Sequence, residues 1–152
     1  DEYAKMRDGL AQFVANAKEK GITVMIEDVG RTANPCSQVK YLKRFLQDIP
    51  DLMFTVDSGN LYYAGRGEDI REMVDFAKDR IAHVHIKDQT KENCRRYATG
   101  GLGAGPNADV VRTVAKRGYN GWYTIENPVG ADHFADTLRQ MAVIRYWCGG
   151  GR

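Results

Sequence analysis

Cysteine is scarce in this sequence, and its few positions form neither a zinc-binding pattern nor a disulfide framework. Cys36, Cys94 and Cys148 are odd in number and widely spaced, and no C-x-x-C pair exists. Zinc sites and disulfide-rich domains use closely spaced or evenly paired cysteines. We therefore expect free thiols in a reducing compartment and no zinc site made of cysteine.

Long apolar runs and concentrated charge are also missing. No apolar run approaches the roughly 20 residues that a membrane span needs, and the acidic start, Asp1 and Glu2, lacks the apolar core of a signal peptide. The net charge at pH 7 is +2, and the 22 Lys and Arg are spread along the chain rather than gathered in a basic stripe. We therefore expect a soluble, cytoplasmic protein whose partners include no nucleic acid and no membrane.

Four short segments alternate apolar and polar residues, which is the pattern of a β-strand with one buried face. They span residues 21–27, 52–57, 83–88 and 122–126. In the third segment, Val84 and Ile86 alternate with His83 and His85. Each segment ends in or near a residue of a type that binds metal ions, and these residues are Glu27, Asp57, His85 and Glu126.

Segments with helical periodicity separate these strands. They comprise residues 2–19, the segment between Ser37 and Pro50, the segment after Gly67, the segment between Asn107 and Gly118, and residues from about 132 to 147. Residues 58–60 are expected to form a turn, and residues 89–106 a long, glycine-rich loop. The pattern is one helix followed by four βα units at a spacing of about 30 residues, as in right-handed βαβ crossovers.

Two α/β architectures have this pattern, an open doubly wound sheet and part of a (β/α)8 barrel. The first βα turn, Glu-Asp-Val-Gly-Arg, is not a glycine-rich dinucleotide loop. In a barrel the strand ends curve around one axis, so four polar residues can converge on one ion. We therefore predict that residues 1–148 are the C-terminal half of a (β/α)8 TIM barrel, with its last four βα units, and that residues 149–152 are a flexible tail.

Four motifs at barrel spacing give the sequence a family resemblance: "VMIEDVG", "FTVDSGN", "HVHIKD" and "WYTIEN". Together they resemble the divalent-metal site of the xylose-isomerase-like barrels, which include sugar and sugar-phosphate isomerases, epimerases and inosose dehydratases. The resemblance implies that Glu27, Asp57, His85 and Glu126 bind the metal. It also implies that Glu27 and Glu126 are the catalytic acid/base pair.

Three carboxylates and one imidazole suit a hard or borderline divalent cation. We expect Mn²⁺ first, with Mg²⁺, Co²⁺ and Zn²⁺ as alternatives. Such an ion can polarise a substrate carbonyl and stabilise the enediolate that forms when the neighbouring carbon loses its proton. The resemblance therefore predicts a sugar or sugar-phosphate isomerase or epimerase, with a small carbohydrate as its partner.

Three further residues are candidates for substrate binding: Asn60, Lys87 and His83. Asn60 stands where ketohexose epimerases usually have histidine. Lys87 could bind a substrate oxygen or phosphate, or pair with Asp88 or Asp57. His83 lies two residues before His85, so a hydrogen-bonded histidine deeper in the barrel is the alternative to substrate contact. The glycines of 100–105 could offer backbone N–H groups to an anion.

Two other functions remain open at this point. A dehydratase of the keto-inositol or dehydroshikimate type would use the same metal site and expel a β-hydroxyl. The chain could also be an inactive fragment or homologue that binds only a metal or a partner. A half barrel has two unpaired strand edges, so we expect a homo-oligomer or association through those edges.

Overall fold

A four-stranded parallel sheet organises the chain. The structure is a computed structural model that describes residues 2–30, 34–126, 129 and 131–150. The strands of the sheet are β1 (Met25–Glu27), β2 (Met53–Asp57), β3 (Ile81–Ile86) and β6 (Trp122–Ile125). Their order in the sheet, β1-β2-β3-β6, is their order along the chain, and every neighbouring pair is parallel. This is the strand order of a partial barrel, as the sequence predicted.

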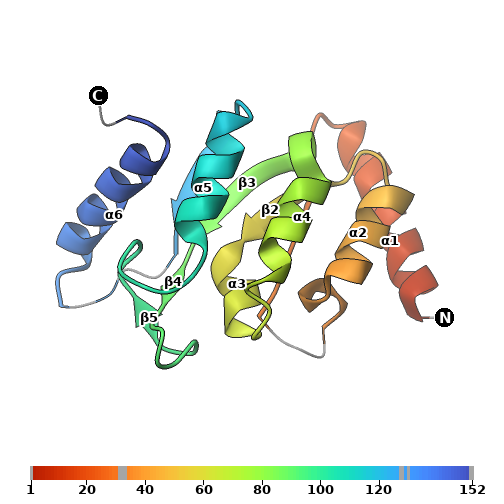
Figure 1. Cartoon of the computed structure of the whole chain (residues 1–152). Coiled ribbons are helices and arrows are strands. Elements are labelled where there is room, and N and C mark those ends of the chain that lie inside the picture. The colour runs from red at the N-terminus through yellow and green to blue at the C-terminus, as the bar shows by residue number, and fades with distance from the viewer. Residues whose placement is uncertain (1, 31–33, 127–128, 130, 151–152) are drawn as a thin grey trace.

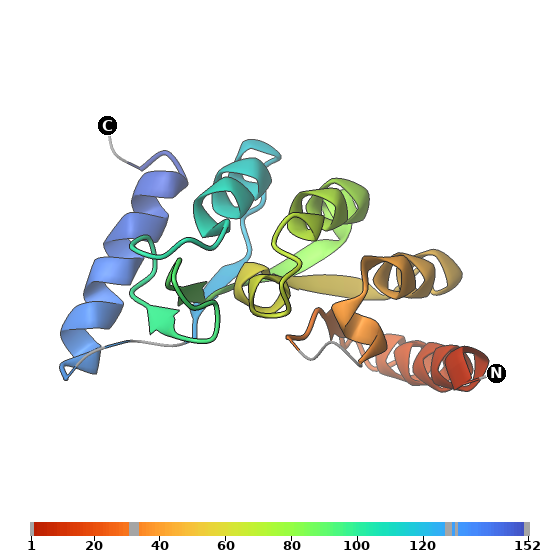
Figure 2. The same ribbon diagram turned by 60° about the horizontal axis from the view of Figure 1, so that its bottom comes forward.

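Helices connect the strands and cover one face of the sheet (Figures 1 and 2). The helices are α1 (Glu2–Lys18), α2 (Val39–Asp48), α3 (Ser58–Tyr63), α4 (Asp69–Ala77), α5 (Asn107–Lys116) and α6 (His133–Trp147). Two short 3-10 turns, η1 (Pro35–Ser37) and η2 (Lys78–Arg80), precede α2 and β3. None of the helices in the described ranges is long and apolar enough to cross a membrane.

The core lies between the sheet and the helices. Phe54 and Val56 of β2 and Val84 of β3 are fully buried, and Ile86 is nearly so. They meet the apolar faces of the helices, whose buried residues include Leu42, Phe45, Leu46, Ile70, Met73, Val74, Val110, Val111 and Val114. Burial of each such side chain contributes about 1.5–3 kcal/mol to folding. The predicted alternation is confirmed, because the polar residues of the strands are thereby left on the opposite face.

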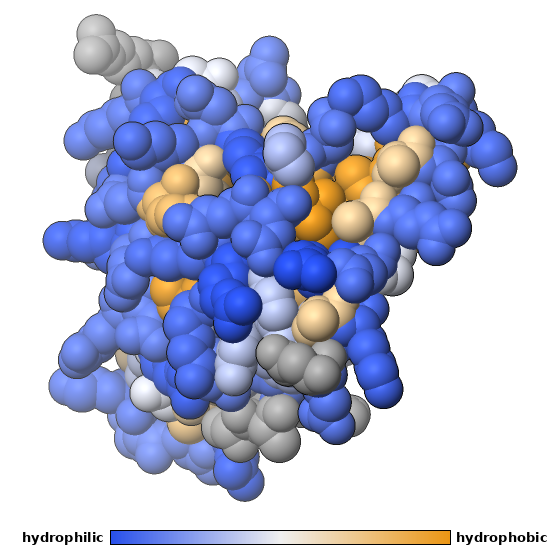
Figure 3. All heavy atoms as spheres, turned by 90° about the vertical axis from the view of Figure 1, so that its right-hand side faces the viewer, coloured by the Kyte–Doolittle hydropathy of each residue, from blue (hydrophilic) through white to orange (hydrophobic). Residues whose placement is uncertain are grey.

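The outer strands β1 and β6 each have a single strand neighbour within the described part of the chain. Trp122 of β6 is 79% exposed and Met25 of β1 is 41% exposed. Phe13 and Ile22, on α1 and just beyond it, are also exposed. Figure 3, which views the molecule from the side of α1, shows apolar surface among the polar side chains. Both edges therefore have the open, partly apolar character expected of half a barrel.

Local structure differs from the predictions in three places. The first strand begins at Met25 rather than at residue 21, because the chain after α1 is still in a turn, with Gly21 at a φ of +68°. Residues 58–63 form α3 instead of a simple turn, because the Asp57 side chain caps it by accepting the N–H of Asn60 at 3.0 Å. The predicted loop 89–106 contains a short antiparallel pair, β4 (Asp88–Gln89) with β5 (Tyr97–Ala98).

The C-terminus of α6 is closed by glycine. The N–H groups of Gly149 and Gly150 donate to the carbonyls of Tyr146 and Arg145 at 3.0 and 2.9 Å, and Gly149 has a φ of +88°. These bonds satisfy carbonyls that the helix end would leave free. Residues 151–152 lie outside the described residues, so the flexible tail stays a prediction.

Arg80 ties the start of β3 to the end of α2. Its guanidinium donates to the carbonyls of Leu46, Ile49 and Leu52, the Ile49 contact being 2.8 Å. We expect Arg80→Ala to lower the free energy of unfolding by about 2 kcal/mol, because it leaves several half-buried carbonyls without a charged donor. Chemical denaturation measures this change. Arg112→Ala, at an exposed position of α5, is the control, and an equal loss in both variants would contradict the prediction.

Candidate metal centre

Four side chains from four different βα units meet at the carboxyl end of the sheet. Glu27, Asp57, His85 and Glu126 stand at or just after the ends of β1, β2, β3 and β6. Each offers one ligand atom, and these four atoms all lie within 4.8 Å of one another. The register explains this convergence: Asp57 is paired with His85, and Glu126 donates its N–H to the carbonyl of Ile86. The structure thus brings together the four residues that the sequence singled out as metal ligands.

His85 is at the centre of the group. Its Nδ1 lies 2.7 Å from Glu126 Oε1, 3.3 Å from Glu27 Oε1 and 3.7 Å from Asp57 Oδ2. These contacts are close, yet Nδ1 is a buried atom without a hydrogen-bond partner of acceptable geometry among the described residues. A nitrogen placed among carboxylate oxygens that it does not hydrogen-bond is the arrangement expected around a shared cation. The donor set therefore fits a divalent metal ion.

Lys87 joins the cluster from the same face of β3 as His85. Its Nζ lies 2.8 Å from Asp57 Oδ2 and 2.6 Å from Glu126 Oε2, and donates to Asn60 Oδ1 at 3.1 Å. Burial lowers the pKa of Lys87, but the charges of Asp57 and Glu126 outweigh it and raise the pKa, so Lys87 is an ammonium. This ammonium lies against two of the three carboxylates of the cluster, those of Asp57 and Glu126.

Asp57 is the least accessible ligand, with an exposed fraction of 0%. Burial raises its pKa, but the neighbouring imidazole of His85 and the positive charge of Lys87 more than offset this, and the net pKa is lowered. Asp57 also accepts the N–H of Asn60 at the start of α3. The carboxylate is therefore ionised and held in one orientation, as a metal ligand must be.

Asn60 is placed between the cluster and the first strand. Its Nδ2 donates to Glu27 Oε1 at 3.1 Å and to the carbonyl of Asp28 at 2.9 Å, while its Oδ1 accepts from Lys87. The amide therefore orients a predicted ligand and the ammonium at the same time. The sequence predicted that Asn60 contacts the substrate. Its position allows contact with a substrate in addition to its hydrogen bonds with Glu27 and Lys87.

His83 does not join the cluster. Its Nε2 lies 2.7 Å from Thr124 Oγ1, and its ring packs edge-on against that of His85, with 5.0 Å between the centroids. Burial, and then the proximity of His85, lower its pKa. Two roles were considered for His83, substrate contact and a hydrogen-bonded position deeper in the barrel. This geometry supports the second.

A cavity of about 500 Å³ opens beside the cluster. Asn60 and Lys87 belong both to its wall and to the cluster. Its remaining lining consists of Val29, Gly30, Asn34, Tyr63, Gln89 and Tyr97. Aromatic rings together with a few polar groups are a common lining for small-molecule ligands.

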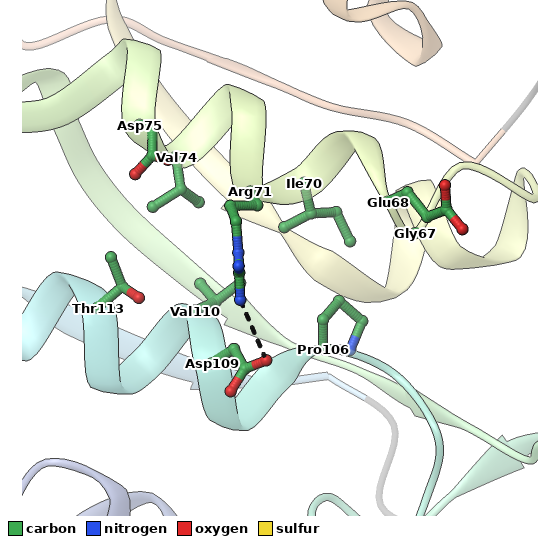
Figure 4. Close-up of a pocket in the computed structure, with 10 residues that line it drawn as sticks. All are labelled: Gly67, Glu68, Ile70, Arg71, Val74, Asp75, Pro106, Asp109, Val110 and Thr113. Carbon is green, nitrogen blue, oxygen red and sulfur yellow. Dashed lines mark ion pairs between the residues drawn. The ribbon is translucent and has the colours of Figure 1, made fainter.

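A second cavity, of about 340 Å³, lies between α4 and α5 (Figure 4). Arg71 of α4 reaches across it towards Asp109 of α5, with 3.9 Å between the charged atoms. Its lining residues come from the two helices and the segments before them, and none belongs to the cluster at the strand ends. We therefore place the candidate active site at the first cavity.

Sequence reasoning missed Asp28, the residue after Glu27. It is fully buried, and its Oδ1 accepts the N–H of Asp57 at 2.7 Å, so it fixes the backbone of a predicted ligand. Its Oδ2 has no hydrogen-bond partner among the described residues. Burial, and then the charge of Asp57, raise its pKa well above the usual range. An aspartate that follows a strand is ordinary in sequence, so no pattern could have singled it out.

Asp88 was considered as one of two partners for Lys87, but Lys87 pairs with the other, Asp57. The carboxylate of Asp88 instead accepts backbone N–H groups of the glycine-rich loop. The N–H groups of Gly101, Gly103 and Gly105, which were considered for binding an external anion, are thus already occupied. An aspartate directly before a glycine-rich loop was the only signal that the sequence offered.

Comparison with known proteins identifies enzymes to which this chain is similar. An inosose dehydratase of Geobacillus thermodenitrificans is 24% identical over 169 residues, which cover 98% of this chain and 56% of the relative. An inosose dehydratase of Clostridium perfringens is 32% identical over 94 residues, covering 60% of this chain and 30% of the relative. The solved structure of an L-ribulose 3-epimerase has a TM-score of 0.77 at 18% identity, over 99% of this chain and 55% of that chain.

At that identity the structural likeness establishes the fold alone. The chain spans about half the length of the relatives that it matches from end to end. The sequence profile described as "Xylose isomerase-like TIM barrel" matches residues 1–146, almost the whole chain. The chain therefore belongs to the xylose isomerase-like TIM barrel family, of whose barrel it forms a part.

Proposed function

We propose that this chain supplies the metal-binding half of a divalent-metal-dependent sugar or sugar-phosphate isomerase or epimerase. The observation that supports this most is the meeting of His85 Nδ1 with three carboxylate oxygens, none of which it hydrogen-bonds. The proposed ligands are Glu27, Asp57, His85 and Glu126, and Mn²⁺ is the proposed ion. When bound, such an ion would polarise a substrate carbonyl and make the adjacent carbon more acidic.

Glu27 and Glu126 are the proposed acid/base pair. They come from β1 and from the end of β6, the two outer strands of the sheet, so they approach the cluster from opposite sides. One carboxylate can remove the proton next to the carbonyl to give an enediolate, and the other can return a proton to it. If the proton returns to the same carbon the product is an epimer, and if it returns to the neighbouring carbon the product is an isomer.

Lys87 and Asn60 are the proposed substrate contacts within this chain. Both border the cavity and both touch a predicted ligand. Because Lys87 is held as an ammonium, it can donate hydrogen bonds to a substrate oxygen but cannot act as a base. His83 remains a weaker candidate, since its Nε2 is engaged with the Thr124 hydroxyl.

A dehydratase is the second candidate function. The observation in its favour is that both curated relatives compared above are inosose dehydratases. It would start with the same proton abstraction and then expel a β-hydroxyl. Incubation with a ketose and with an inosose separates the two functions, because a dehydratase product has lost one water in its mass spectrum and an epimer has not.

Metal binding is the first test of the proposal. Titration of the chain with Mn²⁺ in a calorimeter should give one site, and Glu27→Gln or His85→Ala should weaken its affinity by about tenfold or more. This is a lower bound, because loss of a residue that only orients a ligand already costs about 10- to 100-fold. Glu92→Gln, at an exposed position, is the control. No binding by folded wild-type chain would exclude the site.

Association through the open edges is a further part of the proposal. The edge strands β1 and β6 and the exposed side chains of Trp122 and Phe13 would be covered in a closed barrel. We therefore expect the isolated chain to elute from gel filtration as a dimer or larger species. A monodisperse monomer in light scattering would contradict this.

The free thiols of all three cysteines are compatible with the cytoplasmic location proposed from the sequence.

A further inference from the structure

The carboxylate of Asp88 is enclosed by backbone N–H groups. Its Oδ1 accepts from Gln89 and Gly105 at 3.0 and 2.9 Å, and its Oδ2 accepts from Gly101 and Gly103 at 3.0 and 3.1 Å. The residue is 3% exposed, and no cationic side chain of the described residues forms an ion pair with it. Four short N–H bonds can stabilise a buried carboxylate without a countercharge.

The glycines of this loop are required by the closeness of the contact. A Cβ at position 103 would lie 2.3 Å from Asp88 Oδ1, and a Cβ at position 105 would lie 2.9 Å from the same oxygen. The loop is also fixed to the neighbouring residue, because Ala104 donates its N–H to the carbonyl of Gln89 at 2.8 Å. The loop 101–105 is thus wrapped around an internal anion.

Lys87, the residue before Asp88, is held along its backbone as well. Asn107 at the start of α5 donates its Nδ2 to the carbonyl of Lys87 at 3.1 Å. Gly59 is close enough that a Cβ there would lie 2.4 Å from the same carbonyl. Gln89, on the other side of Asp88, donates its Nε2 to the carbonyl of Gly59 at 2.9 Å. The backbone on both sides of Asp88 is therefore anchored.

We propose that Asp88 is a positioning residue, which fills the glycine loop as an internal anion and thereby holds Lys87 on the carboxylates of Asp57 and Glu126. Without this carboxylate the four N–H groups lose their acceptor and the loop separates from the end of β3. The Lys87 ammonium then loses its fixed position. The functional meaning rests on the proposed function, because Lys87 borders the proposed metal centre.

The test measures the loop and Lys87 directly in the metal-free chain. In Asp88→Ala, hydrogen exchange at the amides of Gly101, Gly103 and Gly105 should accelerate about tenfold or more, as expected for loss of charge-assisted hydrogen bonds. Acylation of Lys87 by an amine-reactive reagent, followed by mass spectrometry, should rise by a similar factor of about ten. Formate, added at high concentration against chloride as control, should reverse both changes.

Matched variants make the outcome decisive. Glu92→Ala removes an exposed carboxylate between β4 and β5 and should change neither readout. Asp88→Asn keeps the volume of the side chain but turns an N–H group towards the donors, so it should loosen the loop without opening a cavity. Wild-type exchange and acylation rates in a folded Asp88→Ala or Asp88→Asn variant would overturn the proposal. So would misfolding of both variants that formate does not repair, because the carboxylate would then support the fold as a whole.

The result also separates this proposal from the proposed function. Failure of wild-type chain to bind Mn²⁺ would remove the metal centre but leave the effect of Asp88 on Lys87 measurable. Normal Mn²⁺ binding together with an unaltered Lys87 in the Asp88 variants would leave the metal centre intact and exclude the positioning role.

Discussion

If Glu126 acts as proposed, Glu126→Gln is expected to lower the turnover number of the proposed isomerase or epimerase by about 10²- to 10⁴-fold, the range in which a positioned general acid or base contributes. The amide keeps the shape of the side chain but can neither take up nor release a proton. Glu126 also lies 2.7 Å from His85 Nδ1 and 2.6 Å from Lys87 Nζ, so the substitution weakens the metal centre as well.

Isotope exchange separates the acid/base role from the ligand role. With each of two epimers incubated in ²H₂O, Glu126→Gln should stop wash-in of deuterium from one epimer only, and Glu27→Gln from the other. Saturating Mn²⁺ during the assay removes the contribution of weaker metal binding. Equal rates of exchange from both epimers in either variant would exclude a two-base mechanism with these residues.

The candidate site was predictable because each of its predicted ligands lies at or just after the end of a strand that alternates apolar and polar residues. Strand alternation gave the face of Asp57 and His85, and parallel strands place their carboxyl ends at the same edge of the sheet. Burial then followed the pattern, with Val56 and Val84 at 0% exposed on the opposite face. The positions of the predicted ligands follow from the course of the strands rather than from individual side-chain contacts, so the sequence alone located them.

Other features depend on single side-chain contacts, which leave no periodic trace in the sequence. The helix at Ser58–Tyr63 exists where a turn was expected, because the carboxylate of Asp57 reaches the N–H of Asn60. The role of Asp88 depends on where the loop 101–105 returns, some 13 to 17 positions later in the chain. A contact at that separation depends on the tertiary path of the loop, which composition does not specify.

Lys87 illustrates the same limit within the site. Its presence on the ligand face of β3 followed from alternation, but its partner did not. Asp88 is adjacent in sequence, yet alternation turns that side chain to the other face, while Asp57 on β2 lies 2.8 Å from the ammonium. Partners across a sheet are therefore decided by register, which the structure supplies.

Metal binding is expected to become about tenfold tighter for each unit of pH between about pH 6 and 8. Contact with the carboxylates of Asp57 and then Glu27 raises the pKa of His85 to about 10 in the metal-free protein. Only the neutral imidazole can bind a metal ion, so each ion that binds must displace a proton from His85. Lys87 does not add to this dependence, because its raised pKa keeps it charged throughout the range.

The sign of the effect on stability follows from the same shift. Since the pKa of His85 is raised from 6.5 to about 10, its charged form stabilises the metal-free fold fully below pH 6.5. That contribution is lost as the pH rises through 10. The metal-free protein therefore becomes less stable as the pH rises over this interval, while affinity for Mn²⁺ increases. The rise in melting temperature caused by a fixed Mn²⁺ concentration should accordingly grow with pH.

Calorimetry in buffers of different ionisation enthalpy measures the displaced proton directly. We expect release of about one proton per Mn²⁺ at pH 7, because a group with a pKa near 10 is almost fully protonated there. His85→Ala should bind more weakly and release no proton, whereas His133→Ala, at an exposed position, should behave as wild type. An affinity independent of pH would mean that His85 is already neutral in the metal-free protein, and that the carboxylates around it do not hold a proton in the ion's place.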